Sequence, residues 1–254
     1  MTLTAIILTH NNQNQIRQLI ASLSWCDEII IIDDQSTDRT RIIAKKLGAK
    51  VFIRLLRHNF AAQRNFGLSH VATDWAFFVD PDETVSSALA REIKSSIKSR
   101  LNGFFINRTD YFLGKQLQHG ETGHVRLLRL AKTHTGRWHR PVHEIWRVKA
   151  PVGQLRSPLF HQPHPNLASF LDKINYYTTL EAHHRPLPER RRLLFELVCY
   201  PPAKFVFNYI FRFGFLDGLP GLVSALMMSI HSLLVRLKLY EKSLAQPAHH
   251  SNRR

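Results

Sequence analysis

Short apolar runs alternate with longer polar and amphipathic stretches through the first hundred residues of the chain. Four of the runs are short, apolar and rich in β-branched or aromatic side chains, which predicts buried strands at 3–8, 28–32, 51–53 and 75–79. Between and after them, the pattern predicts helices at 15–23, 38–47, 61–69 and 86–97. Strands that alternate with helices indicate an α/β domain with a mostly parallel sheet and helices on both faces.

The last third of the sequence has a different pattern. Residues 193–215 are crowded with Phe, Tyr and Leu and are interrupted by Pro201 and Pro202, whereas 222–239 form an apolar helix with basic residues at its end. Apolar, aromatic helices with basic flanks are typical of a membrane interface, although a helical pair packed on the first domain fits the same pattern. The stretch 218–235 has no charged residue but contains Pro220 and Gly221, so the sequence leaves open whether it spans a membrane or lies on one.

Composition narrows the class of protein. With 254 residues, 44% of them hydrophobic, and only 11 Gly and 12 Pro, the chain is long enough for one packed α/β domain plus an appended element, and it is not collagen-like or disordered. Cys26 and Cys199 lie far apart without metal-ligand spacing, which is typical of a protein of the reducing cytosol. The apolar run at the N-terminus is expected to be a strand rather than a secretory signal.

The formal net charge of +16 is unevenly distributed. Residues 1–100 carry 13 basic and 10 acidic side chains, 101–184 carry 11 and 5, and 185–254 carry 11 and 4. The first segment therefore holds most of the carboxylates, while the rest is suited to an anionic partner such as nucleic acid, phospholipid or a phosphorylated acceptor.

Polar clusters follow three of the predicted strands, where parallel sheets bind their ligands. Asp33 and Asp34 are adjacent carboxylates whose repulsion a donor-rich ligand would offset, although a turn and helix cap explains Ser36 or Thr37 equally well. After the fourth strand, 80–83 read Asp-Pro-Asp-Glu, three carboxylates on a rigid turn. Such oxygen ligands suit Mg²⁺ or Mn²⁺, and a solvated acidic turn that caps the next helix is the alternative.

These clusters, in this order and spacing, resemble the inverting family 2 glycosyltransferases of GT-A fold. The resemblance lies in Thr-His-Asn at 9–11, Ile-Asp-Asp-Gln-Ser-Thr-Asp at 32–38, Asn59 with Ala-Gln-Arg-Asn-Phe-Gly at 62–67, and Asp-Pro-Asp-Glu at 80–83. It implies that Thr9, Asp33, Asp34 and Arg64 hold the nucleotide and that Asp80 and Asp82 hold a divalent ion, Mg²⁺ or Mn²⁺, on its diphosphate. Such an ion would stabilise the charge that builds on the departing phosphate, and the Arg64 fork would support it.

Inversion also requires a base that takes the proton of the acceptor hydroxyl. Glu144 is one choice, because it follows a segment dense in Arg, Trp and His that could grip a sugar and its phosphates, and Asp110 is the rival. A salt-bridged surface carboxylate explains Glu144 as well. We expect Glu144 to lie on the acceptor side, away from the nucleotide pocket.

Later motifs resemble lipopolysaccharide core β-glucosyltransferase-like proteins. They are Asn-Arg at 107–108 with Tyr-Phe-Leu-Gly at 111–114, Val-His-Glu at 142–144, and Arg-Phe-Gly-Phe-Leu-Asp-Gly at 212–218. This resemblance implies a nucleotide-sugar half at 1–105, an acceptor half at 106–190, membrane-associated helices at 191–245 and a disordered tail at 246–254.

The sequence therefore predicts a hexosyltransferase, with glucose the expected sugar, that acts from a UDP-sugar on an anionic acceptor. That acceptor would be a lipopolysaccharide core or another lipid-linked saccharide at the cytoplasmic face of the inner membrane. A transferase that uses a polyprenyl phosphate acceptor is the nearer alternative. A basic nucleic-acid-binding protein is the distant one, favoured by the Arg, Trp and His of 126–147, but it leaves the acidic clusters unexplained, so no nucleic acid partner is expected.

Overall fold

The computed structural model describes residues 1–123 and 125–245, which form two compact units. The first unit comprises 1–111 and 125–163, and the second comprises 112–123 and 164–245. Neither boundary coincides with the limits at 105 and 190 expected from function, so that functional division stays a prediction. The tail predicted at 246–254 lies outside the described residues.

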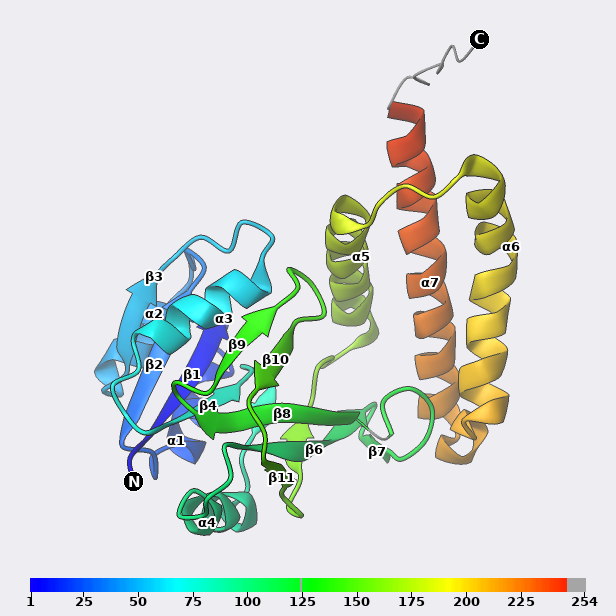
Figure 1. Ribbon diagram of the computed structural model, residues 1–254. Helices are drawn as coiled ribbons and strands as arrows, with labels where there is room; N and C mark the ends of the chain where they lie inside the picture. The colour runs from blue at the N-terminus through cyan, green and yellow to red at the C-terminus, as the bar shows by residue number, and fades with distance from the viewer. Residues whose placement is uncertain (124, 246–254) are drawn as a thin grey trace. The chain divides into compact units, whose positions relative to one another are not determined.

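The first unit is built on one mixed sheet with the strand order β3-β2-β1-β4-β8-β6-β12-β5. Figure 1 labels the strands of this order from β3 to β6. Its parallel half consists of β1 (Leu3–Thr9), β2 (Glu28–Asp33), β3 (Lys50–Ile53) and β4 (Trp75–Val79). The other half consists of β5 (Glu83–Thr84), β6 (Gly103–Phe112), β8 (Val125–Lys132) and β12 (Leu159–His161), with β11 (Val152–Gln154) beside β6. Because β8 runs antiparallel to both β4 and β6, it links the two halves.

Helices cover both faces of this sheet. One face packs against α1 (Ile16–Ser22), α2 (Thr40–Lys46) and α4 (Ser87–Ser96). The other packs against α3 (Phe60–Ser69) and the hairpin of β9 (Gly136–His139) and β10 (Ile145–Val148). Alternate residues of β1 serve the two layers, since Ile7 belongs to the first core and Ile6 to the second. The predicted α/β class with a mostly parallel sheet is confirmed, and the predicted elements match to within a few residues at their ends.

Two glycines allow these elements to form. Gly48 follows α2 with a φ of 85°, the left-handed conformation that commonly ends a helix. A Cβ on Gly67 would lie 2.8 Å from Cγ2 of Ile6, so only glycine lets α3 approach the sheet this closely.

The second unit is helical. It contains α5 (Leu167–His184), α6 (Arg190–Val206), a π-helical turn η1 (Phe207–Phe211), a 3₁₀ turn η2 (Gly214–Asp217) and α7 (Leu219–Ala245), together with the short strand β7 (Lys115–Leu117). Within this unit α7 packs against both α5 and α6 (Figure 1). Of the described residues, only those of α7 form a helix long and apolar enough to cross a membrane, by length and composition alone.

The expected break at Pro201 and Pro202 is wrong, because α6 continues through both residues. Proline lacks an N–H group, so two helical hydrogen bonds are lost there. Packing on α7 compensates: Pro201 is buried, and the hydroxyl of Ser229 on α7 donates to its carbonyl oxygen at 2.7 Å. The predicted C-terminal helices are therefore present, and their association with a membrane stays a prediction.

Candidate active site

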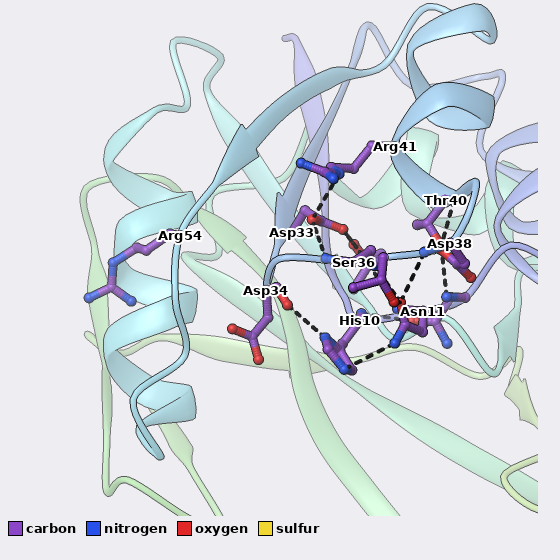
Figure 2. A network of polar contacts seen from close by, with 12 residues as sticks. His10, Asn11, Asp33, Asp34, Ser36, Asp38, Thr40, Arg41 and Arg54 are labelled. Carbon is purple, nitrogen blue, oxygen red and sulfur yellow. Dashed lines mark hydrogen bonds and ion pairs between the residues drawn. The ribbon is translucent and has the colours of Figure 1, made fainter.

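The ends of β1 and β2 are locked together by a buried carboxylate. Asp33 is fully buried, and its oxygens accept hydrogen bonds from the Thr9 hydroxyl at 3.1 Å and from both the backbone N–H and the hydroxyl of Ser36 (Figure 2). Arg41 adds an ion pair at 3.6 Å. The sequence predicted that a ligand would offset the repulsion between Asp33 and Asp34. For Asp33, hydrogen-bond donors of the protein itself stabilise the negative charge.

The loops that follow β1 and β2 are also fixed by hydrogen bonds. Asn11 has a φ of 53°, and its side-chain oxygen accepts from the Thr37 N–H at 2.8 Å. The His10 ring contacts the carbonyl oxygen of Asp34 at 2.6 Å. The Asp34 carboxylate turns away from the Asp33 cluster and accepts from the Leu56 N–H at 2.8 Å (Figure 2). Of the two adjacent carboxylates, Asp34 is therefore the one with access to a ligand.

The helix cap expected at Ser36 or Thr37 is not formed, because the N-cap residue of α2 is Arg39, which makes no side-chain capping hydrogen bond. The Asp38 carboxylate accepts from both the backbone N–H and the hydroxyl of Thr40, the first residue of α2. Ser36 instead serves Asp33.

At the end of β4, two buried arginines enclose Asp80. The Arg64 Nη2 group donates to one oxygen of Asp80 at 2.9 Å, and Arg129 donates to the other. Burial alone would raise the pKa of Asp80, but Arg129 and Arg64 outweigh it and hold that pKa far below its ordinary value. Asp80 is therefore a permanent anion, and Arg64 is a buried residue of α3 rather than a surface helix arginine.

Arg64 also binds Glu144, with 2.7 Å between Nε and Oε1. This corrects the expectation that Glu144 lies away from the predicted nucleotide residues. The reason is the docking of the β9–β10 hairpin on α3, where the Asn65 side chain exchanges two hydrogen bonds of 2.9 Å with the backbone of Trp138. The N–H of Phe60 binds the carbonyl of Pro141 at 2.9 Å, which fixes the loop before Glu144.

One face of the β9–β10 hairpin is buried in the core. Trp138 and Trp146 are paired across the strands, stack on each other and are buried against Phe78. The Arg64 guanidinium lies 4.7 Å from the centre of the Trp138 ring, a cation–π contact inside the protein. Trp138 is therefore a core residue and does not present its ring to a sugar, as the sequence suggested it could.

Glu83 and Arg129 support Asp80 from within the core. Glu83 is buried, accepts from the Asp80 N–H at 2.8 Å and lies 3.3 Å from Arg129. Burial and the charge of Asp80 raise the pKa of Glu83, against the opposing effect of Arg129. The turn at 80–83 thus combines a buried anchor, Glu83, with the partly exposed Asp82.

A second set of polar side-chain contacts connects Asp82, His161 and Asp110. His161 Nε2 lies 3.5 Å from Asp82, its Nδ1 lies 2.9 Å from Asp110, and Asp110 also receives two hydrogen bonds from Arg108. Burial would lower the pKa of His161, but its hydrogen bonds to Asp110 and Asp82 raise it to about 9. Burial would raise the pKa of Asp110, and His161 and Arg108 lower it instead.

Sequence reasoning missed His161 and Arg129. His161 lies on the three-residue strand β12, outside any recognisable motif, and Arg129 sits in a strand where a basic residue recurs at every third position among apolar ones. Only strand pairing, which sets β12 beside both β5 and β6, brings His161 to the acidic turn.

The two predicted metal ligands, Asp80 and Asp82, differ in the surroundings of their carboxylates. Across 1–123 and 125–245, no group of three or more His, Cys, Asp or Glu side chains could hold a metal ion by itself. Both oxygens of Asp80 are taken by arginines. Asp82 is partly exposed, so it is the carboxylate of this turn that could contact an ion, whose other ligands would come from a substrate.

The fold and this edge of the sheet define an α/β protein whose polar side chains cluster at the carboxyl ends of parallel strands, where such sheets bind ligands. Residues 4–149 match the model of the family described as glycosyl transferase family 2. The chain belongs to that family, which makes it a transferase and confirms the resemblance found in its motifs.

Two curated relatives extend the likeness over nearly the whole chain. The lipopolysaccharide core biosynthesis glycosyltransferase LpsC of Rhizobium meliloti is 28% identical across 95% of this chain and 93% of its own. The uncharacterized glycosyltransferase RT0209 of Rickettsia typhi is 25% identical across 95% and 88%. Among solved structures, Staphylococcus aureus TarS (residues 1–349) aligns with 98% of this chain and 93% of its own, at 13% identity and a TM-score of 0.48.

Proposed function

We propose that this family 2 enzyme transfers a hexose, glucose being our choice, from a UDP-sugar to a lipopolysaccharide-core or other lipid-linked saccharide. The likeness to LpsC, a lipopolysaccharide core biosynthesis glycosyltransferase, supports the acceptor class. The observation that carries the proposal is the pairing of Arg64 with both Asp80 and Glu144, because it links the predicted diphosphate site to a carboxylate that can act on the acceptor.

The nucleotide is held, in this proposal, at the ends of β1 and β2. Asp34 contacts it directly, since its carboxylate is the accessible one of the pair. Thr9 and Asp33 contribute by fixing the loop through their mutual hydrogen bond. Arg64 serves the diphosphate, and its buried Nη1 group, which has no hydrogen-bond partner within the described residues, supports that role.

Asp82 would hold Mg²⁺ or Mn²⁺ against the diphosphate, while Asp80 shapes the site through its arginines. When bound, the ion supplies Lewis-acid stabilisation of the negative charge on the leaving phosphate. Arg64 adds a fixed positive charge to the same region, and its two ion pairs and the Trp138 ring keep it oriented before the substrate arrives.

Glu144 is our choice for the base that removes the proton of the acceptor hydroxyl. Its carboxylate is partly exposed and uses one oxygen, Oε1, for Arg64. Asp110 is more deeply buried, and its oxygens already accept from Arg108 and His161. A base must reach the substrate hydroxyl, which favours Glu144 over Asp110.

The outer face of the β9–β10 hairpin supports an anionic acceptor. Arg137 and Arg147 are exposed and directly opposite each other across the strands, and Arg140 follows in the loop that leads to Glu144. Like charges in such a pair repel, so a bound phosphate or carboxylate would relieve the repulsion. We therefore infer that this face holds the phosphates of the acceptor at the cytoplasmic side of the inner membrane.

A release assay tests the proposal. The purified full chain is incubated with Mn²⁺ and each of several UDP-hexoses, with either lipopolysaccharide core acceptors or a polyprenyl phosphate, and both UDP and the glycosylated product are measured. We expect transfer to the core acceptor. Product on the polyprenyl phosphate alone would favour the alternative acceptor class, and absence of transfer and of UDP release with every sugar would reject the UDP-sugar donor.

A further inference from the structure

The outward face of α6 is apolar from Phe195 to the end of the helix. Phe195 is 63% exposed and Val198 is 72% exposed, and Pro202, Val206 and Ile210 repeat at helical spacing and are exposed as well. The following turns expose further large side chains, namely Phe207, Phe211, Phe213, Phe215, Leu216 and Leu219. We call these residues the α6 face; exposed apolar surface of this extent on a soluble protein marks an interaction site.

The exposed charges along the same segment are all positive. From residue 190 to 219 the only carboxylates are Glu196 and Asp217, and both are buried. Glu196 is enclosed by Arg192 and Arg236, and Asp217 accepts from His119. Every exposed charge between 190 and 219 is therefore positive.

Within 1–123 and 125–245, three of these cations have no carboxylate partner. Lys204 pairs with Glu121, but Arg190 and Arg191 precede the face and Arg212 lies within it, with its guanidinium 5.0 Å from the Phe207 ring. An apolar helix face bordered by arginines is the pattern of a helix that lies in a membrane interface, with its charges at anionic headgroups.

The apolar helix α7, by contrast, serves as the packing centre of the second unit. Arg236 is buried and pairs with Glu196 of α6, and the Lys238 ammonium donates to Asn175 and Thr178 of α5. Lys242 donates to the last carbonyls of α5, among them Ala182. The apolar stretch 218–235 ends before this network, but it is packed as well: Met227 shares a core cluster with Phe170 of α5, and Val235 shares one with Leu193 of α6. A bilayer-spanning role for α7 would therefore carry both neighbouring helices and their charges into the membrane, at high cost.

We propose that α6 and its η1–η2 extension lie flat in the surface of a membrane that contains anionic phospholipid, and that α7 does not span it. The inference deepens the proposed location of the enzyme by naming its membrane-contacting surface. It does not depend on which sugar is transferred.

Vesicle flotation with the full chain tests it. We expect binding to vesicles of phosphatidylcholine mixed with phosphatidylglycerol, weaker binding to phosphatidylcholine alone, and release from the mixed vesicles at high salt. The double variant Phe195→Glu/Val198→Glu should lower the partition coefficient about tenfold or more, because it places two charges in the apolar face. Arg190→Gln/Arg191→Gln should remove much of the preference for phosphatidylglycerol.

Ile42→Glu/Leu47→Glu is the matched control, with the same charge change at exposed apolar positions of the first unit, and it should bind like the wild type. Unchanged binding of the Phe195→Glu/Val198→Glu variant, or resistance of the wild type to alkaline carbonate extraction, would overturn the proposal. So would a dimer in solution that fails to bind vesicles and that this variant dissociates. Lipid binding without any sugar transfer would reject the proposed function and leave this inference standing.

Discussion

Arg64 and Glu144 are 80 positions apart in the chain, yet their side chains are joined at 2.7 Å. The pair connects α3, which follows the nucleotide-side strands, to the loop between β9 and β10. Any change at Glu144 therefore also affects the guanidinium that binds Asp80. Donor binding is not an independent control for Glu144, as it would be if the two residues lay in separate halves of the site.

Glu144→Gln should lower turnover by about 10²- to 10⁴-fold with little change in the KM for the UDP-sugar. The amide oxygen of glutamine can still accept from Arg64, so the arginine stays in place, but glutamine cannot take the proton of the acceptor. Steady-state kinetics with both substrates varied measures this. Glu144→Ala should raise the donor KM as well, because it removes the partner of Arg64.

Asp110→Asn separates the two candidate bases. Asp110 is buried with Arg108 and His161, so we expect this variant to lose stability more than turnover. A folded Asp110→Asn protein without activity, beside an active Glu144→Gln protein, would assign the base to Asp110. Denaturant titration of both variants distinguishes loss of fold from loss of chemistry.

The sequence was sufficient to predict the parallel half of the sheet, because its strands are short apolar runs with periodic helices between them. It also predicted the acidic turn at 80–83. It could not predict that Arg129 and His161 complete this turn, since both arrive through strand pairing of distant segments. It failed at Pro201 as well, where packing against α7 outweighs the local preference of proline.

Asp82→Asn should weaken Mn²⁺ binding in the presence of UDP and leave the fold intact, because Asp82 is a partly exposed residue of the turn. Titration calorimetry of Mn²⁺ into the protein with UDP measures the affinity. Asp172→Asn, the same change on the exposed side of α5, is the control and should bind as the wild type does. Equal affinities for both variants, or full activity of the wild type in EDTA, would contradict the metal assignment.

Arg129→Met should destabilise the fold by about 3 to 5 kcal/mol, because it leaves the buried carboxylates of Asp80 and Glu83 without a shared cation. Arg126→Met removes an exposed arginine from the same strand, and there we expect a change within about 1 kcal/mol. Urea unfolding followed by circular dichroism gives both values. A loss at Arg129 no larger than that at Arg126 would mean that the carboxylates find other partners.

His161 should make the stability of the metal-free protein depend on pH. Its pKa is raised from 6.5 to about 9 by Asp110 and Asp82, so the folded state holds the proton more tightly than the unfolded state. The stabilisation is complete below pH 6.5 and is lost as the pH rises through about 9, and it amounts to about 3 kcal/mol. We expect the free energy of unfolding, measured with urea in EDTA, to fall across this range. The glutamine of His161→Gln can still donate to a carboxylate but does not titrate, so the free energy of unfolding of this variant should fall less with pH than that of the wild type. An equal fall in both proteins would show that other groups set the pH dependence.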